Sequence, residues 1–171
     1  MRDAAALAER AGNRIGKVGL FVDADEGVIG EAVVAAGLDA IQLHGRETPV
    51  QAARLRARLG LPVWKALAVA TREDLRGMAD YSGAADLILF DARTPKGALP
   101  GGMGLAFDWT LLSGYRGSLP WGLAGGLSPD NVAEAVRVTR APLVDTSSGV
   151  ESAPGVKDVD KIAAFCKAAR Q

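Results

Sequence analysis

A carboxylate at the end of an apolar run is the first candidate for chemistry. Residues 87–90 are four consecutive apolar residues, and Asp91 follows them directly. Such a short apolar run predicts a strand buried on both faces of a parallel sheet. Ligands of α/β proteins bind beyond the carboxyl ends of such strands. Asp91 is therefore a candidate functional residue, and the alternative is that it only caps the turn that follows.

Two short loops that contain glycine and serine predict a phosphate site. Gly125 and Gly126 follow one predicted strand, and Ser147, Ser148 and Gly149 follow the next. Glycines let backbone N–H groups approach an anion closely, and serine hydroxyls add donors. Phosphate sites of (β/α)₈ barrels are frequently built from the loops after two consecutive strands. Either loop alone fits an ordinary turn, so the prediction depends on the pair.

Other polar or reactive side chains are less specific signals. Gln42 and His44 alternate with apolar residues, so both are expected on one face of their strand. Lys65 lies within a predicted strand, where an unpaired charge is costly. We expect it to pair with a neighbouring acid such as Asp91 rather than to act as a Schiff-base lysine. Cys166 lies on the apolar face of the terminal helix and is expected in the core.

Composition narrows the class of protein. The 171 residues are 49% hydrophobic and 23% charged, which fits a single globular domain over residues 1–171. Twenty basic residues balance twenty acidic ones, so no net charge attracts nucleic acid or a membrane surface. One cysteine and one histidine exclude an intramolecular disulfide and leave little for a metal centre. Without a signal peptide or a long apolar stretch, the sequence predicts a cytoplasmic protein.

Alternating strand and helix patterns position the candidate residues. A helix is expected over residues 2–11, and later helices include one over 26–36, whose apolar face would carry Val28, Ile29, Val33 and Val34. Six strands are predicted, over residues 18–22, 40–44, 61–69, 87–91, 120–124 and 141–144. This alternation predicts a parallel sheet with right-handed crossovers. Two architectures fit: an open doubly wound sheet, or a (β/α)₈ barrel from which two strands are missing.

Several motifs occur in an order that resembles one known family. They are Gln42-Leu-His-Gly45, Leu89-Phe-Asp91, Gly101-Gly-Met-Gly104 with Phe107-Asp-Trp109, Gly125-Gly-Leu-Ser-Pro-Asp-Asn-Val132, Asp145-Thr-Ser-Ser-Gly-Val-Glu151 and Pro154-Gly-Val-Lys-Asp158. The set resembles phosphoribosylanthranilate isomerase over essentially the whole chain. The resemblance implies a (β/α)₈ barrel of tryptophan biosynthesis. It also implies an Amadori rearrangement of N-(5′-phosphoribosyl)anthranilate to 1-(2-carboxyphenylamino)-1-deoxyribulose 5-phosphate, without cofactor or metal.

The resemblance also implies roles for individual residues. Asp91 would be the general acid that protonates the ribose ring oxygen, which requires a carboxyl group that holds its proton near neutral pH. The phosphate of the sugar-phosphate substrate would be held by Gly125, Gly126, Ser147, Ser148 and Gly149. The substrate pocket would be lined by Gln42, His44 and Asp145. The loop over residues 101–104 would lie over the site and help to exclude water.

One departure from the family pattern concerns catalysis. In the family, a first strand carries Lys-Ile-Cys-Gly, whose cysteine is the general base, and a second strand precedes Ser-Pro-Arg, whose arginine pairs with the anthranilate carboxylate. Neither motif occurs in the 171 residues. The resemblance therefore implies a TIM-barrel family member lacking the first two strands, with six parallel strands and surrounding helices. We expect its activity alone to be severely impaired.

Two further expectations follow from that departure. The chain would either close into a smaller, rearranged barrel or pair its open strand edges with a second copy, as a homodimer, or with another chain. The alternative function is a non-catalytic phosphate-binding remnant, or a fragment that requires a complementing chain. A third possibility, another phosphate-binding barrel enzyme such as a ribulose-phosphate epimerase, would want metal ligands on several strands, and one histidine is a poor supply.

Overall fold

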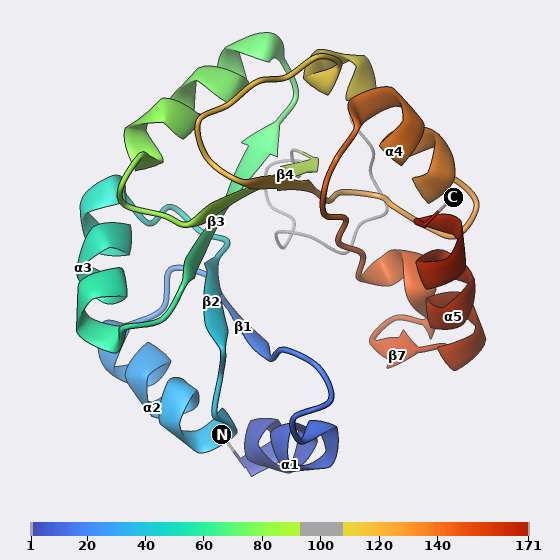
Figure 1. Ribbon diagram of the computed structural model, residues 1–171. Coiled ribbons are helices and arrows are strands. Elements are labelled where there is room, and N and C mark those ends of the chain that lie inside the picture. The colour runs from blue at the N-terminus through green and yellow to red at the C-terminus, as the bar shows by residue number, and fades with distance from the viewer. Residues whose placement is uncertain (1, 93–107, 171) are drawn as a thin grey trace. The chain divides into compact units, whose positions relative to one another are not determined.

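The computed structural model describes residues 2–92 and 108–170 (Figure 1). These residues belong to two compact units. Unit 1 comprises residues up to 66 together with 80–87, and unit 2 comprises residues 67–79 together with those from 88 onwards. A single domain over the whole chain stays a prediction.

Five strands form one sheet in the order β1-β2-β3-β4-β5. Their bounds are β1 (Val18–Phe21), β2 (Ala40–Leu43), β3 (Val63–Val69), β4 (Leu87–Ala92) and β5 (Trp121–Leu123). The pairs β1–β2, β2–β3 and β4–β5 are parallel. The α/β fold with a parallel sheet, expected from the alternation of patterns, is therefore confirmed.

The sixth predicted strand is not confirmed as part of this sheet. Residues 141–144 make one isolated parallel bridge, between Val144 and Leu123. Pro142 has no N–H to donate, which limits the pairing available to so short a segment. The backbone of this segment still runs alongside β5. The N–H of Leu123 donates to Leu143 O, and the N–H of Asp145 donates to Leu123 O.

Three helices of unit 1 begin and end where the sequence signals them. They are α1 (Arg2–Ala11), α2 (Glu26–Ala36) and α3 (Pro49–Leu59). Thr48 and Gln51 form a reciprocal capping box at the start of α3, with proline as its first residue. Gly37 and Gly60 end α2 and α3 in the left-handed conformation, with φ of 54° and 64°.

The predicted inward face of α2 is wrong at two positions. Val34 is 84% exposed and Val28 is also exposed. The helix instead buries Ile29, Ala32 and Ala36, at the i, i+3, i+7 spacing of one helical stripe. Hydrophobicity alone placed the valines inward, whereas the period of 3.6 residues puts the alanines there.

Unit 2 contains β5, β4 from Ile88 onwards and several short elements. These are η2 (Trp109–Leu112), α4 (Val132–Thr139), η3 (Ser148–Val150), the hairpin of β6 (Glu151–Ala153) and β7 (Val156–Lys157), and α5 (Val159–Ala168), which packs against α4. A 3₁₀ segment, η1 (Arg72–Tyr81), follows β3. Phe90 contacts Tyr115 edge-on and Trp121 at a tilt, with ring centroids 5.2 and 5.8 Å away.

The core position expected for Cys166 is wrong, because its side chain is exposed. The buried residue of α5 is Phe165, and adjacent residues point about 100° apart around a helix. None of the helices in the described ranges is long and apolar enough to span a membrane.

Candidate active site

Asp91 lies within β4 and is 6% exposed. Its Oδ1 accepts a hydrogen bond of 2.8 Å from the N–H of Ala92. That bond fixes the orientation of the carboxyl group near the carboxyl end of a buried strand. The position is the one at which ligands of parallel sheets bind.

The loop after β5 runs directly against Asp91. The N–H of Ala124 donates to Phe90 O at 2.7 Å. Gly125 follows with φ of 84°, and a Cβ atom at this position would lie 2.7 Å from Oδ1 of Asp91 and would also collide with the backbone N of Ala92. Only glycine combines this conformation with this close an approach. The first predicted phosphate loop is therefore adjacent to the candidate acid.

The second predicted phosphate loop contacts the first. Thr146 Oγ1 donates to Leu127 O at 2.6 Å. A Cβ atom on Gly149 would collide with Leu127 O and would lie 2.8 Å from Thr146 Oγ1. Asp145, which is exposed, comes just before this loop and is tied to the end of β5 through its N–H. Within unit 2, the structure thus brings together Asp91, Gly125, Gly126, Asp145 and the Ser147–Gly149 loop.

Lys157 is a candidate anion-binding residue that sequence reasoning missed. Its Nζ donates to Ser147 O at 2.9 Å, to Ser147 Oγ at 3.0 Å and to Glu151 Oε1 at 2.7 Å. The hydrogen bond from Lys157, with one from the N–H of Gly155, lowers the pKa of Glu151 below its ordinary value. Because Ser147 Oγ accepts from an ammonium group, its hydroxyl proton is left to donate to an anion.

The residues next to Lys157 in sequence do not indicate that it contacts Ser147. It lies ten positions after Ser147, as the last residue of the β6–β7 hairpin, and only the hairpin turns it back toward the loop. Its place in the motif Pro154-Gly-Val-Lys-Asp158 was the one available signal.

Gln42 and His44 lie together at the end of β2, in unit 1. Gln42 Nε2 is 3.1 Å from His44 Nδ1, so their predicted placement on one face is confirmed. The amide nitrogen of Gln42 donates and does not accept, so this contact fits the tautomer in which Nδ1 accepts and the ring proton is on Nε2. The pair therefore presents a directional N–H donor.

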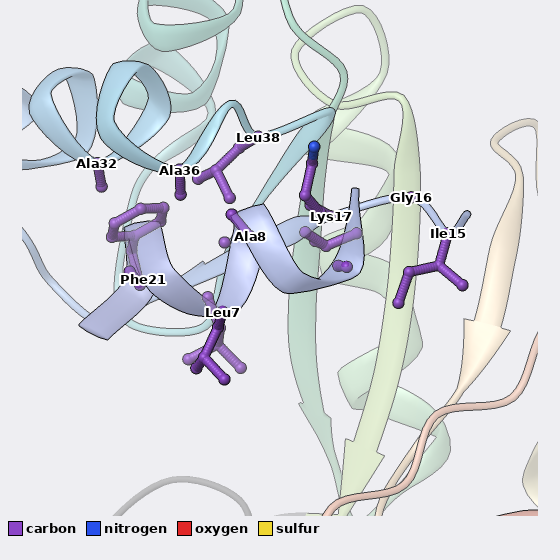
Figure 2. Close-up of a pocket in the computed structure, with 14 residues that line it drawn as sticks. Leu7, Ala8, Ile15, Gly16, Lys17, Phe21, Ala32, Ala36 and Leu38 are labelled. Carbon is purple, nitrogen blue, oxygen red and sulfur yellow. The ribbon is translucent and has the colours of Figure 1, made fainter. Parts of the chain in front are cut away.

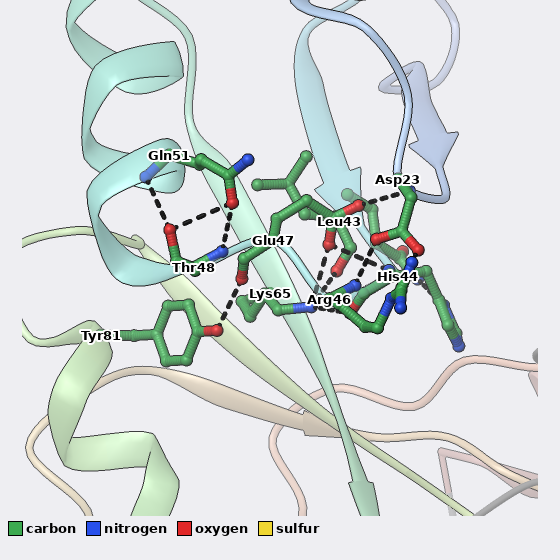
Figure 3. Close-up of polar contacts among 11 residues, drawn as sticks. Asp23, Leu43, His44, Arg46, Glu47, Thr48, Gln51, Lys65 and Tyr81 are labelled. Carbon is green, nitrogen blue, oxygen red and sulfur yellow. Dashed lines mark hydrogen bonds and ion pairs between the residues drawn. The ribbon is translucent and has the colours of Figure 1, made fainter.

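Lys65 has an acid partner that the sequence pattern does not single out. Its Nζ lies 3.1 Å from Glu47 Oε2, and both side chains are buried in unit 1 (Figure 3). Burial lowers the pKa of Lys65 below its ordinary value, and the charge and hydrogen bond of Glu47 partly offset that effect. The expectation that a neighbouring acid pairs with this lysine is confirmed, but the acid is Glu47, whereas Asp91 was the expected example.

Comparison with known proteins identifies the family. The family model described as N-(5′-phosphoribosyl)anthranilate (PRA) isomerase matches residues 2–168. The chain belongs to the N-(5′-phosphoribosyl)anthranilate isomerase family.

Relatives and solved structures agree with that assignment. The N-(5′-phosphoribosyl)anthranilate isomerase of Paracoccus denitrificans is 56% identical over 163 residues, which are 95% of this chain and 76% of the relative. That of Paramagnetospirillum magneticum is 54% identical, over 98% of this chain and 78% of the relative. The crystal structure of the Thermotoga maritima isomerase superposes with a TM-score of 0.84 at 35% identity, over 99% of this chain and 80% of that one.

A further solved structure of this family holds a ligand. It is a phosphoribosylanthranilate isomerase in complex with reduced 1-(o-carboxyphenylamino)-1-deoxyribulose 5-phosphate, with a TM-score of 0.83 and 33% identity, over 99% of this chain and 78% of that one. These neighbours support the TIM-barrel-like fold class of the isomerase family for this chain.

A separate cavity of about 500 Å³ lies in unit 1, between α1, β1 and α2 (Figure 2). Apolar side chains such as Leu7, Phe21 and Leu38 point into it, and Lys17 is its single charged lining residue. A sugar phosphate needs several convergent polar groups. This cavity is therefore no candidate for the isomerase site, and none of the predicted site residues lines it.

Two further expectations concern metal ligands and the loop over the site. The described residues contain no group of three or more His, Cys, Asp or Glu side chains that could hold a metal ion. The predicted cover of the isomerase site, over residues 101–104, lies outside the described residues.

Proposed function

We propose that this chain acts in the Amadori rearrangement of N-(5′-phosphoribosyl)anthranilate to 1-(2-carboxyphenylamino)-1-deoxyribulose 5-phosphate, the isomerase step of tryptophan biosynthesis. One observation in the structure carries the proposal: the buried carboxyl group of Asp91 borders the Gly125 loop closely enough that only glycine fits. Membership of the isomerase family supplies the reaction.

In the proposed reaction, Asp91 gives a proton to the ribose ring oxygen. The bond from C1′ to that oxygen breaks, and the anthranilate nitrogen forms a C=N bond with its lone pair. Loss of the proton at C2′ gives an enol. Addition of a proton at C1′ and loss of the proton from the enol hydroxyl then leave the ketone at C2′. Atoms and electrons balance without a redox partner, so the protein needs to supply an acid, a base and a grip on the substrate.

The two glycine and serine loops supply that grip. Gly125, Gly126 and the residues Ser147, Ser148 and Gly149 would bind the phosphate, with Lys157 adding positive charge beside Ser147. Gln42, His44 and Asp145 would line the pocket around the rest of the substrate. The Nε2–H of His44 is a suitable donor for a substrate oxygen or carboxylate.

Asp91→Asn tests the role of the acid. The amide oxygen can still accept from the N–H of Ala92, so the loop geometry is retained, but no carboxyl proton remains. With a peptide that carries a Lys-Ile-Cys-Gly strand present to supply the base, we expect turnover to fall by about 100- to 10,000-fold while inorganic phosphate still binds. Asp130→Asn, the same change at an exposed residue of unit 2, is the control. Unchanged turnover of the Asp91→Asn protein would remove Asp91 from the mechanism.

We also propose that the 171-residue chain alone turns over slowly. It corresponds to about three quarters of the length of its relatives, and its single cysteine, Cys166, lies on α5. The Lys-Ile-Cys-Gly motif, which would carry the base, does not occur in it. The loss of anthranilate-linked fluorescence measures turnover, and a rate close to that of the relatives would contradict this part of the proposal.

A fragment that needs a complementing chain is the second candidate, and the edge of β1 favours it. Among the described strands, β1 pairs with β2 alone. Lys17 O and Phe21 O accept bonds from the β2 side, so the N–H and C=O groups of Val18 and Leu20 point to the other edge. Leu20 is 56% exposed. An apolar edge with unpaired backbone groups favours pairing with another strand.

Addition of a peptide that carries a Lys-Ile-Cys-Gly strand separates these candidates. Restored turnover supports complementation, whereas retained phosphate binding without turnover supports a non-catalytic role. A homodimer through the same edge predicts that light scattering shows a dimer and that Leu20→Lys returns it to a monomer. A dimer that Leu20→Lys leaves intact would place the interface elsewhere.

A further inference from the structure

The buried ammonium group of Lys65 is bound on every side by groups at the end of β2. Its Nζ donates to Leu43 O at 3.2 Å, to Gly45 O at 2.8 Å and to Glu47 Oε2 at 3.1 Å (Figure 3). An ammonium group has three protons, so all of them are used. Two of the three acceptors are backbone carbonyls, and those two carbonyls flank a single residue, His44.

The carboxylate of Glu47 is the negatively charged member of the same network. Its Oε1 accepts from the N–H of Asp23 at 2.8 Å, and its Oε2 accepts from the N–H of Gly45 at 2.9 Å as well as from Lys65. Its own carbonyl accepts from the Tyr81 hydroxyl at 2.7 Å. The carboxylate therefore ties together the segments that follow β1 and β2 and the middle of β3.

The backbone around His44 is fixed on both sides as a result. The carbonyls of Leu43 and Gly45 bind the ammonium group, the N–H of Gly45 binds the carboxylate, and the N–H of His44 itself donates to Phe21 O at 2.8 Å. On the same strand, the amide of Gln42 contacts the ring at Nδ1. A fixed backbone keeps that amide and the ring in register.

Neighbouring segments of this unit can be linked without a buried ion pair. At the other end of β3, Asp86 accepts from the N–H of Val63 at 2.9 Å and pairs with Arg56 at 2.9 Å, with both side chains partly exposed. Lys65 and Glu47 are only 2% and 6% exposed. Taking two charges out of water is costly, and a buried ion pair often stabilises a protein no more than apolar residues would.

We propose that Lys65 and Glu47 are positioning residues that hold His44 and Gln42 in one orientation, with the ring proton of His44 on Nε2, toward the substrate. The inference rests on the proposed function only for what the histidine faces. The network itself is independent of turnover.

The single histidine makes the test direct, because its imidazole is the sole source of histidine ring signals in ¹⁵N NMR. At alkaline pH, where imidazole is neutral, the ring ¹⁵N shifts report the tautomer. We expect wild type to populate the Nε2–H form. Lys65→Met and Glu47→Gln should move the ring toward a mixture of tautomers. In the Glu47→Gln protein, the side-chain NH₂ would face a donor in either orientation: the N–H of Asp23, or the N–H of Gly45 together with the ammonium of Lys65.

Asp86→Asn and Arg56→Gln are the matched controls. They weaken an ion pair of the same unit, at the other end of β3, without touching the His44 segment. We expect them to lower the unfolding midpoint and to leave the ring shifts of His44 unchanged. A folded Lys65→Met protein with wild-type ring shifts, or a control that moves them as far, would overturn the inference.

Two further measurements keep the test decisive if a single variant does not fold. The double variant Lys65→Met with Glu47→Leu leaves neither charge stranded, and its ring should also lose the tautomer preference. In the wild type, the amide protons of His44 and Gly45 should exchange with solvent as slowly as that of Ile41 in β2. Rapid exchange at Gly45 would contradict the network. None of these readouts uses substrate, so absent turnover would count against the proposed function alone.

Discussion

The absence of a side chain at Gly125 allows its loop to approach Asp91 closely in the candidate site. Its φ of 84° suits glycine, and the absence of a Cβ lets the loop pass within reach of Asp91. Gly149 does the same for the second loop against Leu127. At the scale of single residues, the candidate site therefore depends as much on these glycines as on the groups that would touch substrate.

Gly125→Ala should destabilise the protein by more than its backbone conformation explains. The left-handed conformation costs a non-glycine residue about 1–2 kcal/mol, and the collision with Ala92 and Asp91 adds to that. Gly155→Ala is the control, since its φ is 78° and its surroundings are open. Urea unfolding measures both variants. Equal losses of stability would mean that the loop moves away without cost.

Lys157→Met should weaken the binding of inorganic phosphate by about 2- to 10-fold, the range expected for loss of one hydrogen bond. The variant removes the donor that orients Ser147 Oγ. Lys161→Met is the control, because Lys161 donates to the neighbouring Glu151 O at 2.7 Å but not to Ser147. Calorimetric titration with phosphate measures both. Equal weakening by the two variants would indicate a general loss of positive charge instead.

At the scale of elements, local signals set the ends of helices and tertiary packing set the pairing of strands. The capping box at Thr48 starts α3 directly after Glu47, so the same turn orders a helix and presents the buried carboxylate. The segment over residues 141–144 has a strand-like sequence but pairs at one residue only. Pairing depends on a neighbour with free donors and acceptors, which no local pattern records.

Thr48→Ala should lower the unfolding free energy by about 1 kcal/mol, as loss of an N-cap side chain does. The variant removes the acceptor for the N–H of Gln51 and the hydroxyl that contacts the Gln51 amide. Val50→Ala, at an exposed position of the same helix, should change stability by less than about 0.5 kcal/mol. A Thr48→Ala loss no larger than that of Val50→Ala would show that the capping box does not hold the start of α3.

At the scale of the whole molecule, the buried lysine makes stability depend on pH. The folded-state pKa of Lys65 is lowered, mainly by burial, from an ordinary 10.5. In the window between the two values the unfolded chain binds more protons, so the contribution of Lys65 to stability rises with pH.

Comparison of wild type with Lys65→Met isolates this contribution. The unfolding free energy of wild type minus that of the variant should increase as the pH rises toward 10.5. Measurements by urea unfolding from about pH 7 to about pH 9 stay below the range in which ordinary tyrosines ionise. A difference that decreases as the pH rises would contradict a lowered folded-state pKa of Lys65.

The sequence alone determined the features that are read within a few residues. Apolar runs predicted the strands of the sheet, Thr48-Pro49 and the glycines after α2 and α3 predicted helix ends, and ordered motifs predicted the isomerase family. Asp91 and the two predicted phosphate loops were also singled out this way, because each follows or ends a strand pattern. Such signals succeed because caps, turns and periodicity act over one or two turns of chain.

Only the tertiary structure decided which distant groups meet. Glu47 as the partner of Lys65, Lys157 beside Ser147, and Gly125 against Asp91 are contacts across 10 to 34 residues of chain. The inward alanines of α2 and the exposed Cys166 were likewise misjudged from hydrophobicity. A side chain is buried or paired by what packs against it, and that neighbour is chosen by the fold and not by the residues next to it in sequence.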